Sequence, residues 1–164
     1  MIRDNLQAVQ SNIDAACSRS GRDPKEVTLI AVSKTKPIVA IEEAMDCGIT
    51  QFGENKVQEM VDKIETIPEK LDWHMIGHLQ RNKVKYIIDK TTLIHSVDSY
   101  RLAEQIEEEA AKKGLVCPVL LEVNIADEDT KFGIKPEDVL ELITQISKFQ
   151  HIKVKGFMTV APYV

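Results

Sequence analysis

Hydrophobic residues along the chain form two alternating patterns, short apolar runs and longer stretches with helical spacing. The first apolar run, residues 27–33, is rich in β-branched residues and lacks polar alternation, which is typical of a strand buried on both faces of a sheet. Five further runs predict strands at residues 50–52, 73–76, 93–97, 119–125 and 154–160. The alternation of strands and helices predicts repeated βα units around a parallel sheet.

The stretches with helical spacing predict six helices, one before the first strand and one after each of the first five strands. The leading helix carries Leu6, Val9, Ile13 and Ala16 on one face and is expected to end before Gly21. The inward-facing residues of the other five include Ile41, Met60, Ile87, Ile106 and Ile143. The pattern therefore predicts an α/β fold with six strands and six helices.

This order of elements favours a TIM-like (β/α)8 barrel over a doubly wound sheet, because the rhythm of short connections never reverses. Periodicity alone leaves both folds open. A complete eight-stranded barrel needs at least about 200 residues, whereas the chain has 164. We therefore expect residues 1–164 to form a single barrel domain that is incomplete, either as a fragment or as an open sheet with covered edges.

Composition and charge narrow the classes of function. A net charge of −5 argues against a nucleic-acid partner, since such binding depends on a high density of cations. Cys17, Cys47 and Cys117 are odd in number and widely spaced, which argues against a disulfide framework or a zinc ribbon. No run of about 18 apolar residues occurs and the start lacks a signal-like apolar segment, so we expect a cytoplasmic protein without a membrane partner.

Lys34 follows the first predicted strand and precedes Pro37, which is suited to open a helix. Ligands of parallel α/β proteins bind at the carboxyl ends of the strands. A neutral lysine amine attacks carbonyl groups, and burial can lower a lysine pKa by roughly 3–5 pH units, an effect that the nearby charge of Lys36 would reinforce. Lys34 is thus a candidate Schiff-base former, and the alternative is that both lysines only flank a strand end.

Asn55 and His78 also fall just beyond predicted strands. Asn55 could donate a hydrogen bond to a ring oxygen of a ligand or cap its own helix, and the adjacent Glu54 could pair with a lysine. His78 lies four residues after His74, the spacing of a helical zinc pair, but Gly77 intervenes and the pattern is that of a strand. We expect no metal site, and His78 could contact a ligand or act as a cap.

Asn124 and Met158 are the candidates in the last two strands. Asn124 shares a strand face with Glu122 and, if it points inward, is well placed to hydrogen-bond a bound aldehyde or hydroxyl. Met158 could line the same mouth of the barrel, although a strand methionine usually fills a core.

Five motifs occur in a characteristic order: AVSKTKP at residues 31–37, FGEN at 52–55, WHMIGHLQRNK at 73–83, VNI at 123–125 and GFM at 156–158. Across essentially the whole chain this order resembles the pyridoxal 5′-phosphate (PLP) homeostasis proteins. That family shares its barrel with the amino-terminal domain of alanine racemase.

The resemblance implies that Lys34 forms an internal aldimine with PLP. It also implies that Asn55, His78, Asn124 and Met158 lie around this cofactor. Members of the family are carriers or regulators of PLP without an established reaction, so we expect a monomer that serves PLP homeostasis, with PLP-dependent apo-enzymes as possible partners.

One departure from the family concerns the phosphate group. Family members continue beyond the position of Val164 through Ser-Met-Gly-Met-Ser and Gly-Ser-Thr segments that hold the phosphate. Because backbone N–H groups of such segments bind phosphate strongly, we expect the 164-residue chain to hold PLP poorly and a longer protein to bind it.

Two other classes of function remain open. One is a PLP-dependent racemase-like or other Schiff-base enzyme, which would need an opposing acid or base. The other is a protein- or RNA-interaction module that uses the basic cluster at residues 81–85. We rank the interaction module last, because the net charge of the chain is negative.

Overall fold

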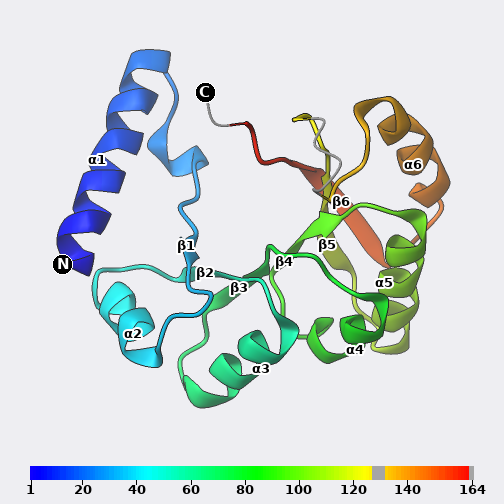
Figure 1. Cartoon of the computed structure of the whole chain (residues 1–164), viewed down its shortest axis with the longest axis horizontal. Coiled ribbons are helices and arrows are strands. Elements are labelled where there is room, and N and C mark those ends of the chain that lie inside the picture. The colour runs from blue at the N-terminus through cyan, green and yellow to red at the C-terminus, as the bar shows by residue number, and fades with distance from the viewer. Residues whose placement is uncertain (127–131, 163–164) are drawn as a thin grey trace.

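The computed structural model describes residues 1–126 and 132–162, and in this part of the chain six parallel strands form one sheet (Figure 1). Each strand pairs with the strands that precede and follow it in the chain, in the order β1-β2-β3-β4-β5-β6. The strands are β1 (Ala31–Val32), β2 (Gln51–Glu54), β3 (Asp72–Met75), β4 (Leu93–Val97), β5 (Cys117–Glu122) and β6 (Ile152–Met158). An order without reversal is that of a barrel and differs from a doubly wound sheet, as predicted.

Helices α2 to α6 follow one another around the outer face of the curved sheet, and α1 lies beside α2 (Figure 1). The helices are α1 (Ile2–Ser20), α2 (Ile38–Asp46), α3 (Val57–Thr66), α4 (Val84–Ile87), α5 (Tyr100–Lys112) and α6 (Val139–Ile146), with short 3-10 turns at Pro24–Glu26, Arg81–Lys83 and Pro136–Asp138. The six predicted helices are therefore confirmed in the described residues.

Local signals explain where several of these helices begin and end. The Ser99 hydroxyl accepts a hydrogen bond from the Leu102 N–H at 3.1 Å and caps α5. Gly21 ends α1 in the left-handed conformation, with φ 69°, which glycine adopts without a steric penalty. These caps fix the points at which the chain turns between helices and strands.

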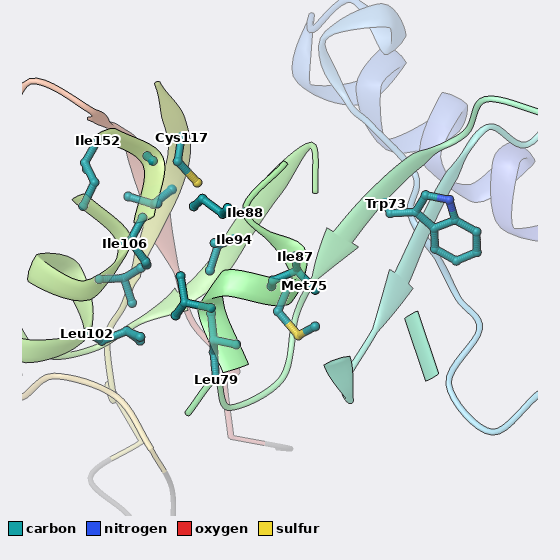
Figure 2. Packing of buried hydrophobic residues seen from close by; sticks show 14 of the residues in the cluster. Trp73, Met75, Leu79, Ile87, Ile88, Ile94, Leu102, Ile106, Cys117 and Ile152 are labelled. Atoms are coloured by element: carbon teal, nitrogen blue, oxygen red, sulfur yellow. The ribbon is translucent and has the colours of Figure 1, made fainter. Parts of the chain in front are cut away.

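The hydrophobic core lies between the outer face of the sheet and the helices. In Figure 2, Leu102 and Ile106 of α5 extend toward the strands, and both are almost fully buried. Other fully buried members include Phe52, Met60, Met75, Ile87, Ile94, Val119 and Leu121. Burial of these side chains holds each helix against the sheet.

Two expectations about buried surface are wrong. The predicted strand at residues 27–33 is reduced to Ala31–Val32, and Val32 is 51% exposed rather than buried on both faces. Among the described residues β1 is an edge strand that pairs only with β2. The exposure of Val32 shows in addition that no described residue covers this side of the strand. On the apolar face predicted for α1, Val9 is 42% exposed and Ala16 is exposed as well, so this face is at most partly buried. In the described residues, no helix has the length and apolar character needed to cross a membrane.

Candidate functional site

Lys34 lies in the turn that follows β1, at the carboxyl end of the sheet. The preceding Ser33 is buried and its hydroxyl donates a hydrogen bond to Glu54 at the end of the neighbouring β2. Lys34 itself is exposed. The expected shelter of this amine is therefore not found in the described residues, whereas its position at the strand end is confirmed.

Asn55 follows β2 and lies against the end of β3. A Cβ added to Gly77 would come within 2.8 Å of both the Cα and the backbone oxygen of Asn55. Only glycine permits this close approach of the two strand ends. Since β1 and β2 are neighbours, with Val32 opposite Gly53, Lys34 and Asn55 belong to the same part of the carboxyl edge.

Asn124 and Met158 lie at the other side of the same edge, at the ends of β5 and β6. Glu122 pairs with Met158 across β5 and β6, and the Val123 N–H donates to the Met158 carbonyl at 2.9 Å. The Asn124 N–H donates to the Ile134 carbonyl at 2.8 Å. A Cβ on Gly133, which has φ 121°, would lie 2.8 Å from the Asn124 nitrogen, so glycine is required here as well.

The His78 ring stacks on Phe132, with centroids 3.9 Å apart and an angle of 7° between the planes. Burial raises the pKa of the nearby Asp98 carboxyl, and a charged His78 acts in the opposite direction. Burial also raises the pKa of Glu122, and the charge of Asp98 adds to this effect. His78 thus belongs to a partly buried polar group at the carboxyl ends of β4 and β5, and Phe132 is a contact that the sequence did not indicate.

A buried ionic network underlies the Lys34 turn. Lys63 of α3 is 6% exposed, and its ammonium lies 2.9 Å from Glu54 Oε2 and 2.7 Å from Glu59 Oε2. The Ser33 hydroxyl donates a hydrogen bond to Glu54, which is fully buried. The suggested pairing of Glu54 with a lysine is confirmed, but Lys63 was not recognised as its partner.

The position of Lys63 in the helical pattern could have revealed this role. Lys63 follows the buried Met60 by three residues and therefore lies on the inward face of α3. A lysine on such a face requires a partner, because an unpaired buried charge is costly. The hydrogen bond from Lys63 lowers the pKa of Glu59, although desolvation opposes this shift. The hydrogen bond from the Thr35 N–H and the charge of Lys63 act in the same direction as the Lys63 hydrogen bond.

Two buried histidines form a second polar group on the inner face of the sheet. Gln51 Nε2 lies 2.5 Å from Asp72 Oδ2, which leaves Gln51 Oε1 as the acceptor for His74 Nε2–H at 2.7 Å. When His74 is neutral, its Nδ1 accepts from His95 Nε2–H at 2.9 Å. The lowered pKa values of both histidines favour this neutral, directional arrangement.

Acidification is expected to destabilise the fold through these histidines. Burial lowers the pKa of His74, and burial and the charge of His74 lower the pKa of His95 to about 4. Below the unfolded-state pKa of about 6.5 the unfolded chain binds more protons, so stability falls as the pH decreases from about 6.5 to about 4, by an order of 2–3 kcal/mol for His95. Urea denaturation at several pH values measures this slope.

The matched variant for this experiment is His95→Gln, whose side-chain amide can still donate to His74. Between pH 6.5 and 4, the free energy of unfolding of this variant is expected to decrease less than that of the wild type. Asp98 and Glu122, with raised pKa values, act in the opposite direction in both proteins, so the difference between the two isolates His95. Equal slopes would contradict the prediction.

The predicted residues thus form two groups along one edge of the sheet, Lys34 with Asn55 and Asn124 with Met158. Strands β3 and β4 lie between the two groups, and His78 follows β3. Within the described residues, no three His, Cys, Asp or Glu side chains are grouped so as to hold a metal ion. Amines, amides and an imidazole suit an organic ligand that carries a carbonyl group.

The chain shows similarity to known proteins over nearly its whole length. The family described as "Alanine racemase, N-terminal domain" matches residues 5–164. A pyridoxal phosphate homeostasis protein of Aquifex aeolicus is 43% identical over 162 residues, which cover 98% of this chain and 71% of that protein. The chain belongs to the family of pyridoxal phosphate homeostasis proteins.

Solved structures share the fold of this chain. One described as an unknown protein from Bifidobacterium adolescentis has a TM-score of 0.92 at 34% identity, over 99% of this chain and 70% of that one. PipY of Synechococcus elongatus, solved with PLP bound, has a TM-score of 0.82 at 35% identity, over 99% of this chain and 71% of PipY. The expected barrel of the alanine racemase N-terminal type is confirmed as the fold of this family.

Proposed function

We propose that this chain binds PLP through Lys34 and takes part in PLP homeostasis. The observation that carries the proposal is the position of Lys34, an exposed primary amine at the carboxyl edge of the sheet. The similar protein PipY has been solved with PLP bound, which supports the choice of ligand. The lysine stands directly after β1, where barrel proteins present their reactive groups. Residues 1–164 would act as one cofactor-binding domain.

Bound PLP supplies an aldehyde that condenses reversibly with an amine. Lys34 would be the residue that holds the aldehyde carbon, through condensation of its amine with loss of the carbonyl oxygen as water. The side-chain amides of Asn55 and Asn124 would donate hydrogen bonds to polar atoms of the ligand. His78 and Met158 would contact the ring at the same edge.

We further propose that the protein is a monomeric carrier in the cytoplasm that passes PLP to PLP-dependent apo-enzymes. A Schiff base suits this task, because hydrolysis or exchange with another amine releases the aldehyde unchanged. Racemase-like chemistry would require a second acid or base opposite Lys34. Incubation with amino acids, monitored by chiral chromatography, is expected to show no racemisation.

Borohydride trapping tests the proposal directly. The purified protein is mixed with PLP, reduced, and analysed by intact mass and peptide mapping. We expect one cofactor per chain, with the adduct in the peptide that contains Lys34. An adduct confined to another side chain, or no adduct in either this chain or a longer version of the protein, would overturn the proposal.

A further inference from the structure

We propose that Lys63 is a positioning residue that fixes the backbone on both sides of Lys34. The inference rests on the proposed role of Lys34 and deepens it. Its basis is the set of acceptors around the Lys63 ammonium, which donates to the Ser33 carbonyl oxygen at 2.7 Å, to Glu54 Oε2 at 2.9 Å and to Glu59 Oε2 at 2.7 Å.

These contacts bracket Lys34 along the chain. Ser33, immediately before it, is held through its carbonyl by Lys63 and through its hydroxyl by Glu54. The Thr35 N–H, immediately after it, donates to Glu59 Oε2 at 2.6 Å. One cation on α3 therefore anchors the preceding residue directly and the following residue through Glu59.

The turn between these anchors needs such support. Thr35 has φ 63°, in the left-handed region that β-branched residues rarely adopt. Within the turn, the Lys36 N–H donates to the Ser33 carbonyl at 3.0 Å, the same oxygen that Lys63 holds. Backbone strain of this kind persists only where surrounding contacts enforce it.

The same geometry separates the roles of the two lysines. An ammonium has three N–H donors, and the Lys63 ammonium has three acceptors within 2.9 Å. All three donors are therefore engaged and the side chain is buried, so this nitrogen is not available to an aldehyde. Lys63 thus holds the turn, and the exposed Lys34 remains the amine that reacts.

The first test follows amide hydrogen exchange in the protein without PLP. Lys63→Met and Glu59→Ala are expected to accelerate exchange of the Thr35 amide by about tenfold or more, because hydrogen bonds to charged groups are lost. Amides of the core strands β4 and β5 should keep their protection in Glu59→Ala, since Glu59 is partly exposed and outside the core. The matched control is Lys112→Met, which removes an exposed i,i+4 partner of Glu108 on α5.

The second test measures PLP affinity from the visible absorbance of the Schiff base. Lys63→Met and Glu59→Ala are expected to weaken binding by about tenfold or more, corresponding to loss of one charged hydrogen bond. Lys63→Arg, which retains the cation, should recover part of the affinity. Lys112→Met should match the wild type.

The outcomes distinguish this inference from the proposed function. If the wild type forms a Schiff base on Lys34 and both variants match Lys112→Met in exchange and affinity, the positioning role is wrong and the proposed function stands. If no adduct forms on Lys34 in the wild type, the proposed function fails, whatever the exchange data show. Should Lys63→Met fail to fold, Glu59→Ala decides the question.

Discussion

Replacement of Lys34 by alanine is expected to abolish the visible absorption band that the wild-type protein develops with PLP. The band arises from the Schiff base, which requires a primary amine at this position. Because Lys34 is exposed, the substitution leaves no cavity and removes no buried partner, so the fold should be unaffected. Absorbance titration and mass after borohydride reduction measure the loss, and circular dichroism checks the fold.

Lys36→Ala is the matched control for this prediction. Lys36 lies two residues away, is also exposed and carries the same functional group, but follows the left-handed Thr35. The variant should keep the band and the trapped adduct. A band of wild-type intensity in Lys34→Ala would mean that another amine carries the cofactor.

The largest loss of stability is expected for Glu54→Ala. Glu54 is fully buried, and its carboxylate bonds to both Lys63 and Ser33. Its removal leaves the buried Lys63 with Glu59 as its remaining carboxylate and takes the carboxylate acceptor from the Ser33 hydroxyl, at a cost of about 1–3 kcal/mol. Urea denaturation with linear extrapolation should show a decrease of this size in the free energy of unfolding.

Glu108→Ala provides the comparison for an exposed ion pair. Glu108 lies 4.0 Å from Lys112 on the surface of α5, and both side chains are more than half exposed. Its removal should change the free energy of unfolding by less than about 1 kcal/mol. A loss below about 1 kcal/mol for Glu54→Ala as well would show that burial does not strengthen the inner pair.

Much of the fold was predictable because its signals are local. The spacing of Leu102, Ile106 and Ala110 determines the buried face of α5, and Ser99 marks its start. The extent of β1 was not predictable, because an apolar run does not reveal how many neighbours a strand has. Val32 belongs to a run with the composition of a central strand, but its side chain is as exposed as that of an edge strand.

The candidate site was predictable where one residue type has a distinctive chemistry at a strand end, as for Lys34. The support beneath it was missed because its members are distant in sequence. Lys63 lies thirty residues after Ser33, and a charged residue on a helix is usually exposed. Phe132 has no sequence pattern that links it to His78, since the contact depends on how two loops approach each other.

The hydrogen-bonded chain from Asp72 through Gln51 and His74 to His95 also has a consequence for strand alignment. It joins three adjacent strands, β2, β3 and β4, and each donor has one acceptor. If β2 slipped by one residue against β3, Gln51 would turn to the opposite face and leave the His74 ring without its acceptor. These hydrogen bonds therefore specify a single register of the three strands. Apolar side chains, which can replace one another in a core, do not provide this specificity.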